Sequence, residues 1–325
     1  MKIPSIHPEQ ERHSSLLKAG GCMGRLEDIA IWFSIRQDQP VPELLRPTLV
    51  LFAADHGVAA AMGYGEKTND ELRKNAAEGS AIRILCQQAG AGLHIVDVGV
   101  DDGLVDVDDI EHAKVRSTGS ADIRKTAAMD QMDYWECVGI GEEMANRAIN
   151  DGSNLLIASS ISCGDNIAIA AILAELAGLS PEAALLSTAD PAIYTQELMA
   201  VEQALARAQG TPSHDILREI GGLEFASMAG FYRAAATRGV PVLLDGRASV
   251  AAALATIAWD VCIAGWMLAS HVSDDTGHRE ALESLGLEPM MELKSGIEKG
   301  KVAALLLPLL QSAINFQQGL TTIEA

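Results

Sequence analysis

Short apolar runs alternate with longer segments of helical periodicity along most of the chain. The helix-like segments bring apolar residues to one face every three to four positions, and the short runs are typical of buried parallel strands. The predicted strands cover residues 47–54, 93–98, 154–159 and 240–244, with a further strand at 181–187. The predicted helices cover residues 1–35, 70–89, 129–150, 167–176, 196–208, 223–237 and 301–316.

This alternation predicts an α/β fold with a parallel sheet covered by helices on both faces. We expect a large α/β domain over residues 36–288. The segments 1–35 and 289–325 are helix-like and are expected to pack together as a smaller helical lobe. In such sheets ligands bind beyond the carboxyl ends of the strands, so the motifs that follow strands are the candidates for a site.

The composition excludes several classes of protein. The 325 residues include 24 Lys and Arg against 44 Asp and Glu, which gives a formal charge of −20. A chain this acidic lacks the basic patch of a nucleic-acid-binding protein and the polybasic face of a membrane-surface protein. Aromatic residues make up only 4% of the chain, too few for a base-stacking platform. We therefore expect neither nucleic acid nor a membrane as a partner.

Targeting segments are not recognisable in the sequence. The longest apolar runs, 251–258 and 302–310, are about half the ~20 residues that a transmembrane helix needs. The first residues, MKIPSIHPEQERH, lack the apolar core of a signal peptide. The five cysteines form no CxxC pair, which is typical of reduced thiols. The sequence therefore predicts a cytoplasmic protein.

Two loops with an aspartate follow predicted strands. Asp55 and His56 come after residues 47–54, and Asp245 begins an Asp-Gly-Arg tripeptide after residues 240–244. A carboxylate beside an imidazole can orient a substrate or relay a proton. The alternative is a structural role, in which these side chains bond to nearby backbone groups and stabilise the loops.

The segment 159–166 follows a strand and opens a helix. At such a position backbone N–H groups and the helix dipole can hold a phosphate, which makes Ser160, Gly164 and Asn166 candidate binding residues. The loop carries a single glycine and matches neither GxGxxG nor GxxxxGK[ST]. An ordinary capped helix start is the alternative.

Polar residues are also dense at 270–278, after an apolar segment expected to be helical. Two His and two Asp suggest a metal, but their spacing matches no standard zinc pattern. A ribose or anion contact through Ser273 fits the hydroxyl-rich segment better, and capping of the next helix fits equally well. Further along, Gly296 and Glu298 precede the last helix. Glu298 is a candidate general base or, alternatively, a first-turn acid favoured by the helix dipole.

Taken in order, these segments resemble the nicotinate-nucleotide–dimethylbenzimidazole phosphoribosyltransferase (CobT) family. The match covers nearly the whole chain, and its specificity lies in the order of the motifs. The matching segments are residues 18–27, 54–58, 75–79, 88–91, 97–99, 221–230, 241–246, 270–273, 277–278, 288–289 and 303–308.

The resemblance implies a Rossmann-like parallel sheet with a small helical lobe, in a dimer. It implies transfer of ribose phosphate from nicotinate mononucleotide to an aromatic base that becomes the lower ligand of a cobamide. A glutamate before the final Ala-Ala helix would remove the proton of the acceptor base. No metal or organic cofactor is implied.

Several positions depart from the family pattern in the phosphate loop. If the loop is anchored on Asn166, Ile161 takes the place of the family's glutamate. Ser160 and Cys163 take the places of glycines, and Asp165 stands where a small neutral residue is expected. An acid in an anion site repels the ligand by about 1 kcal/mol at ~4 Å even in water.

At three further positions the chain also lacks the functional residue that the family has there. Glu197 matches the family's phosphate-binding lysine, and Leu72 falls near its acceptor-site glutamine. Counting back without a gap from the last helix places Lys299 at the position of the catalytic glutamate, with Glu298 one residue away. A lysine cannot accept a proton at neutral pH unless its pKa is strongly lowered.

Three hypotheses remain. The chain is a subunit with a degenerate site that pairs with an active paralogue, resembling the ArsB-type subunit of the heterodimeric enzyme that activates phenol or p-cresol. Alternatively, it is an active homodimer that uses Glu298 as the base. The third hypothesis is a non-catalytic protein that binds a nucleotide or an aromatic base.

Overall fold

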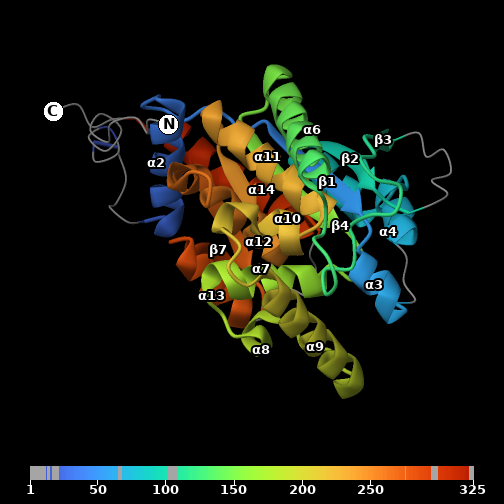
Figure 1. Ribbon diagram of the computed structural model, residues 1–325. Helices are drawn as coiled ribbons and strands as arrows, with labels where there is room; N and C mark the ends of the chain where they lie inside the picture. Colours follow the sequence, from blue (N-terminus) through green and yellow to red (C-terminus); the bar gives the residue numbers. More distant parts are fainter. Residues whose placement is uncertain are drawn as a thin grey trace.

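A seven-stranded parallel sheet forms the centre of the molecule. The computed structural model describes residues 12, 15–16, 22–64, 68–101, 109–274, 276–293 and 299–321. Within these residues the strand order is β3-β2-β1-β4-β5-β6-β7, and every neighbouring pair is parallel (Figure 1). The strands are β1 (Pro47–Ala54), β2 (Gly92–Gly99), β3 (Glu111–His112), β4 (Leu155–Ile161), β5 (Val242–Leu244), β6 (Met267–Val272) and β7 (Pro289–Glu292).

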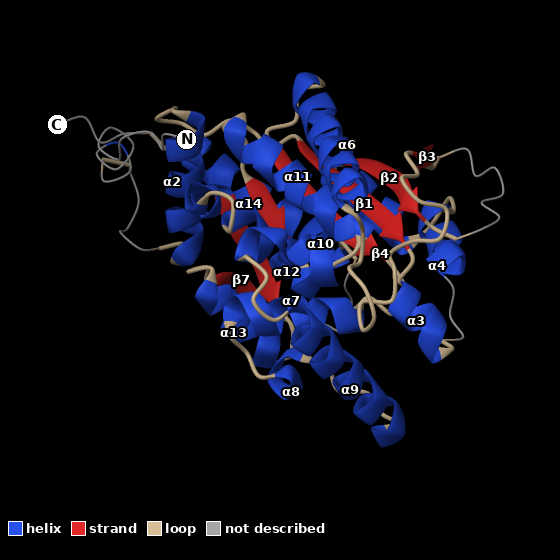
Figure 2. Cartoon of the chain, in the orientation of Figure 1, coloured by secondary structure: helices blue, strands red, loops and turns tan. Residues whose placement is uncertain are grey.

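Helices cover both faces of the sheet, as the alternating pattern predicts (Figure 2). The α-helices of the first half are α2 (Arg25–Gln37), α3 (Gly57–Met62), α4 (Thr68–Ala76), α5 (Ala81–Ala89), α6 (Gln131–Asn150) and α7 (Asn166–Ala177). Those of the second half are α8 (Pro181–Ala184), α9 (Pro191–Ala208), α10 (Ile216–Ile220), α11 (Leu223–Thr237), α12 (Gly246–Ile257), α13 (Thr276–Ser284) and α14 (Lys301–Gly319). Two 3₁₀ helices, η1 (Ser213–Asp215) and η2 (Val261–Trp266), complete the connections.

Strand β1 shows how the sequence builds two cores. All eight of its residues are buried, and successive side chains point to opposite faces of the sheet. Val50, Phe52 and Ala54 join the core beneath α6, α7, α11 and α12. Leu49, Leu51 and Ala53 join the core beneath α2, α4, α5 and α14. A continuous apolar run is therefore required, because neither face of β1 meets solvent.

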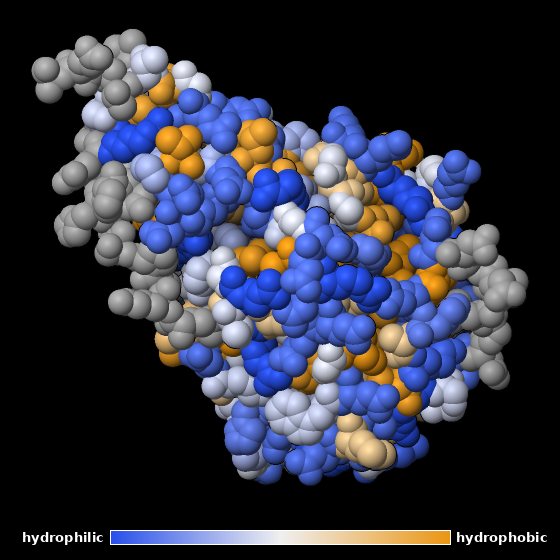
Figure 3. Space-filling view, turned by 90° about the horizontal axis from the view of Figure 1, so that it is seen from above, coloured by the Kyte–Doolittle hydropathy of each residue, from blue (hydrophilic) through white to orange (hydrophobic). Residues whose placement is uncertain are grey.

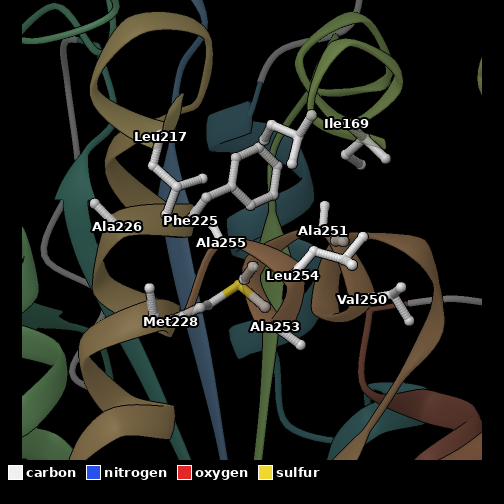
Figure 4. Close-up of a cluster of buried hydrophobic side chains, with 14 of the residues drawn as sticks. Ile169, Leu217, Phe225, Ala226, Met228, Val250, Ala251, Ala253, Leu254 and Ala255 are labelled. Carbon is white, nitrogen blue, oxygen red and sulfur yellow. The ribbon is translucent and has the colours of Figure 1, made fainter. Parts of the chain in front are cut away.

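Small residues allow the helices of the first face to approach closely. A Cβ on Gly141 of α6 would lie 1.8 Å from the Ser227 carbonyl oxygen of α11, and one on Gly230 would lie 2.1 Å from the Val138 carbonyl oxygen. Figure 4 shows Phe225 and Met228 of α11 directed toward the alanine-rich α12. This tight packing fixes the start of α11, where a buried glutamate of the site lies.

Several predictions about secondary structure are confirmed and several are wrong. The four main strands are present, but residues 181–184 form α8 instead of a strand. The predicted helix 70–89 is divided into α4 and α5, with Gly79 between them at a φ of +81°. Strands β3, β6 and β7 were not predicted. Ser270 and His271 therefore lie within β6 rather than after a helix.

The predicted helical lobe needs one correction. Residues 289–292 are β7, which pairs with β6 at the edge of the sheet, so this part of the 289–325 segment is not helical. Helices α2 and α14 do pack against each other, and both share a core with Leu49 and Leu51 of β1. The division of the chain into two domains stays a prediction.

The face of the molecule seen in Figure 3 is predominantly polar. Seen from above, hydrophilic side chains cover most of the visible face, with apolar groups between them (Figure 3). No helix among the described residues has the length and hydropathy needed to cross a bilayer.

Candidate active site

The carboxyl ends of four neighbouring strands bring the predicted site residues to one edge of the sheet. Asp55 and His56 follow β1, the loop 162–165 follows β4, Asp245 follows β5 and Ser273 follows β6. The register of β1 with β2 shifts between Ala53 and Ala54, directly before Asp55. Such irregularities are common where a strand delivers side chains to a site.

A pocket of about 440 Å³ lies at the end of β1, against α3 and α4. Its size is in the range of small-molecule sites. Two carboxylates, Asp55 and Asp101, line it, and no described lining residue is Lys or Arg. The lining residues are Asp55, His56, Ala59, Ala60, Tyr64, Thr68, Asn69, Asp101, Thr118 and Cys163.

A buried ion pair supports one wall of this pocket. His56 Nε2 lies 2.7 Å from Glu224 Oε1, and both side chains are fully buried. Burial on its own lowers the pKa of His56, but the charge of Glu224 and its hydrogen bond outweigh burial and raise it. Among the described residues His56 Nδ1 and Glu224 Oε2 have no hydrogen-bond partner. Gly222 makes room for the pair, since a Cβ there would lie 2.5 Å from Glu224 Oε2.

Asp55 has the structural role that the sequence offered as one of two alternatives. Its Oδ2 accepts the backbone N–H of Asp101 at 2.5 Å, which ties the end of β2 to the end of β1. Asp55 also lines the pocket. The structural role is therefore present, and a contact with substrate stays a prediction.

The loop between β4 and α7 is fixed by contacts to β1 and α4. Ser162 Oγ donates to the Ala54 carbonyl oxygen at 2.8 Å, and Cys163 N donates to Thr68 Oγ1 at 3.0 Å. Gly164 has a φ of +79°, and a Cβ there would lie 2.2 Å from Ala59 Cβ. The single glycine of this loop is thus needed for the backbone turn and for the close approach of α3.

Asp165 is the residue at the N-terminal cap of α7. Its side chain bonds to no backbone N–H of the helix, and Ser160 Oγ donates to Asp165 Oδ2 at 3.3 Å. Burial raises the pKa of Asp165, although His56 and Lys299 act in the opposite direction. An acid therefore lies where the helix dipole would otherwise attract an anion.

A second acid, Glu197 of α9, lies beside the start of α7. The Tyr64 hydroxyl donates to Glu197 Oε1, and Asn166 Nδ2 donates to Oε2 at 3.4 Å. Burial and the bond to Glu197 raise the pKa of Tyr64 far above its usual value. The buried Arg247 donates from Nη1 to Asn166 Oδ1 at 3.2 Å. Tyr64 and Asn166 thus hold the carboxylate of Glu197 beside the first residue of α7, the helix whose start was predicted to bind a phosphate.

Asp245 has mainly backbone partners. Its Oδ2 accepts the N–H of Gly300 at 2.6 Å, and its Oδ1 accepts the N–H of Ala303 at 2.7 Å. Burial raises the pKa of Asp245. Both oxygens are used to hold the first turn of α14, so these contacts match the loop-stabilising alternative.

Ser273 is held by a buried histidine. His278 Nδ1 lies 2.9 Å from Ser273 Oγ and accepts the Ser273 N–H at 3.1 Å. Burial lowers the pKa of His278 to about 3, so this ring is neutral. His271 lies next to it, with ring centroids 5.7 Å apart. In the part of the chain that the structure describes, no three His, Cys, Asp or Glu side chains come together as a metal site.

The C-terminal end of the predicted site is only partly described. Gly296 and Glu298 lie outside the described residues. Lys299 has a φ of +67°, and its Nζ lies 3.5 Å from Glu71 Oε2 of α4. Leu72 and Ile161, which take the places of two polar residues in the resembled family, are fully buried in the core of the second face.

Sequence reasoning missed three members of the site. Glu224 follows Gly221-Gly222 at a helix start, a signal that could have suggested a buried first-turn acid. Tyr64 and Thr68 lie in or next to short helices with no motif, and only the fold brings them to the β4–α7 loop and its surroundings.

The comparisons with known proteins agree with this architecture. A model of the family described as "Phosphoribosyltransferase" matches residues 5–325. The crystal structure of CobT from Thermus thermophilus superposes with a TM-score of 0.91 at 31% identity, covering 98% of this chain and 96% of that one. The fold and these matches define the chain as a member of a phosphoribosyltransferase family.

The named relatives show which phosphoribosyltransferase family this is. The nicotinate-nucleotide–dimethylbenzimidazole phosphoribosyltransferase of Chromobacterium violaceum is 38% identical, covering 100% of this chain and 96% of its own length. The protein of the same name from Pseudomonas aeruginosa is 32% identical over 96% of this chain and 91% of its own. The chain belongs to the nicotinate-nucleotide–dimethylbenzimidazole phosphoribosyltransferase (CobT) family, as its motifs predict.

Proposed function

We propose that this chain takes part in activating the lower ligand of a cobamide, as the partner of an active paralogous subunit. In the reaction, ribose phosphate moves from nicotinate mononucleotide to dimethylbenzimidazole or a phenolic base. The named relatives support the reaction, because they are phosphoribosyltransferases that match over nearly their whole length. The role as a partner subunit, in place of an active homodimer, rests on the residues of this chain.

One observation carries this assignment: two acids occupy the start of α7. Asp165 is the cap residue, and Glu197 is held beside it by Tyr64 and Asn166. A nucleotide phosphate carries up to two negative charges, and each carboxylate repels it. In a partly buried site the repulsion between two unit charges at ~4 Å is about 4 kcal/mol. Arg247, which bonds to Asn166 and to the Ala184 carbonyl oxygen, brings one positive charge against the two acids, so it offsets this repulsion only in part.

In this proposal the chain lacks a group that accepts a proton, in addition to lacking a site that binds the phosphate. Transfer requires a base that takes the proton of the acceptor as its bond to C1′ forms. Lys299 stands at the ungapped position of the family's glutamate, and its ammonium group is directed to Glu71. With a lysine at this position in place of the glutamate, the chain lacks the family's base, so catalysis would depend on the other subunit.

The decisive experiment compares the purified chain alone with the chain co-expressed with a paralogue that carries the complete phosphate loop and glutamate. The readout is formation of the base ribotide from nicotinate mononucleotide, followed by chromatography. We expect no product above background from the lone chain and restored product from the complex. The paralogue alone is the matched control, and it should be less active than the complex. Robust transfer by the lone chain would overturn the proposal.

A further inference from the structure

The outer face of α6 carries large apolar side chains that are exposed to solvent. Met132 and Trp135 lie one helical turn apart, and they are 74% and 47% exposed. Trp135 stacks on Trp259 with ring centroids 6.1 Å apart, and Val261, two residues further along the chain, is 73% exposed. We call these four residues the Trp135 patch. Large apolar groups that are exposed together are typical of an interaction surface.

Gly139 continues this face of α6 one turn beyond Trp135. It lies in the middle of the helix and is exposed, and a Cβ there would meet no atom within 4 Å. Glycine destabilises a helix interior relative to alanine, and no close contact among the described residues compensates this cost. Gly141, on the opposite side of the same helix, admits the backbone of α11. Gly139 gives the outer face the same low profile, which suits the close approach of a second helix from outside.

Carboxylates surround the Trp135 patch and Gly139. Four exposed acids lie within four residues of a member of the patch or of this glycine: Asp130, Glu136, Glu143 and Asp260. The two segments that form the surface, 130–143 and 259–262, contain no Lys or Arg. Arg233 packs over both tryptophan rings from below, and its charge is paired with Glu142 at 2.7 Å. A partner that covers this surface therefore gains Coulomb energy if its flanks are basic and loses it if they are acidic.

We propose that this face of α6 docks an amphipathic helix of a protein partner, with Lys and Arg on both flanks of its apolar side. The apolar side contacts the Trp135 patch, the backbone crosses α6 at Gly139, and the basic flanks pair with the surrounding acids. The surface shares no residue with the pocket at the end of β1, so the proposal does not rest on the proposed function.

Three designed peptides separate charge from apolar contact in calorimetric titrations of the full chain. Each has about 18 residues with the same apolar face of Leu and Ala, and the flanks carry Lys, Gln or Glu. At about 0.15 M salt we expect the basic peptide to bind with a Kd of about 1–50 μM. The neutral peptide should bind at least about tenfold more weakly, and the acidic peptide should show no measurable binding.

Variants of α6 locate the binding surface. Gly139→Gln fills the crossing point and should weaken the basic peptide at least about tenfold. The same change should raise the melting temperature of the free chain, because glutamine is the better helix former. Met132→Ser should also weaken binding at least about threefold. Met199→Ser is the matched control, since Met199 is 53% exposed on α9, and it should leave the affinity unchanged.

A pair of charge variants tests the flanks. Glu136→Gln removes an acid beside the patch and should weaken the basic peptide about three- to tenfold, without changing the affinity for the neutral peptide. Glu202→Gln removes the same charge from the exposed side of α9 and should leave both affinities unchanged. A uniform attraction of the basic peptide to the acidic chain would weaken equally in the two variants and would contradict a docking site on α6.

The proposal is overturned if the basic peptide does not bind, if the basic and neutral peptides bind equally, or if Gly139→Gln binds the basic peptide as the native chain does. Sedimentation of the native chain tests a second copy as the occupant. Self-association that Gly139→Gln abolishes would place a second copy on this face and overturn the basic helix. The transfer assay of the proposed function is a separate measurement, and its outcome leaves this proposal unchanged.

Discussion

Asp245 and Asp165 occupy equivalent places in the fold and have opposite surroundings. Each follows a neighbouring strand of the sheet and stands directly before a helix, and burial raises the pKa of each. Asp245 accepts the N–H of Gly300, the residue before α14, at 2.6 Å and the N–H of Ala303 in α14 at 2.7 Å. Asp165 accepts one serine hydroxyl at 3.3 Å and caps no helix N–H.

This difference separates carboxylates that stabilise the scaffold from carboxylates that set the charge of the site. A buried carboxylate costs free energy unless hydrogen bonds compensate it. Asp245 is compensated by the chain itself, so we expect its removal to destabilise the fold. Asp165 is poorly compensated, so its removal should change ligand binding far more than stability.

The largest effect is expected at the third buried carboxylate, Glu224. Replacing it in Glu224→Ala leaves His56 buried without its partner, so the free energy of unfolding should fall by about 3–5 kcal/mol. Urea denaturation at pH 6 measures the change. A loss below about 1 kcal/mol would show that the pair contributes little to the fold.

Next in size is Asp245→Ala, which leaves two N–H groups at the start of α14 without an acceptor. We expect a loss of about 2–4 kcal/mol in the free energy of unfolding. Asp190→Ala is the matched control, because Asp190 caps α9 at an exposed position through a single N–H and should cost only about 1 kcal/mol. Equal losses for the two variants would contradict the special role of Asp245.

The pH dependence of stability follows from the raised pKa of His56. The unfolded chain releases this proton near pH 6.5, whereas the folded chain holds it to higher pH. The stability contributed by the pair is therefore complete below about pH 6.5 and is lost as the pH rises through the folded value. Unfolding free energies from about pH 6 to 9 should show this fall in the native chain and a flatter profile in Glu224→Gln. Identical profiles would argue against a charged His56.

The smallest expected effect on stability belongs to Asp165→Asn. Because burial raises the pKa of Asp165, its charge is unfavourable in the folded state at neutral pH. The variant should be more stable than the native chain by about 0.5–1 kcal/mol at pH 7. The gain should be complete above the folded pKa of Asp165 and should disappear as the pH falls from there to about 3.8, where the side chain is protonated in the unfolded chain as well. A clear loss of stability at neutral pH would place Asp165 with Asp245 as a structural residue.

The sequence was sufficient for the parts of the fold that have a simple hydrophobic period. Strands β1, β2 and β4 are largely apolar because both faces of each are buried over most of their length. Strands β6 and β7 were missed because β6 follows an apolar 3₁₀ helix and β7 has only four residues. Periodicity does not distinguish such short apolar segments from helix.

The site was predictable only where residues follow strands or match the family's motif order. Asp55, His56, Asp165 and Asp245 were found in this way, and the structure brings them to one edge of the sheet. The partners of Glu197 were not predictable, because Tyr64 is distant in sequence and its contact depends on how the segment after α3 lies against α9. The sequence suggested only a binding role for Gly164, and the structural reason for a glycine there is the close approach of Ala59.

The central claim is that Asp165 and Glu197 exclude the phosphate of the nucleotide donor. The most direct test is the affinity of the full chain for nicotinate mononucleotide, measured by calorimetry for the native chain and for the double variant Asp165→Asn with Glu197→Gln. We predict binding too weak to measure in the native chain and an affinity at least about tenfold higher in the double variant. Tight binding by the native chain that the double variant leaves unchanged would contradict the account.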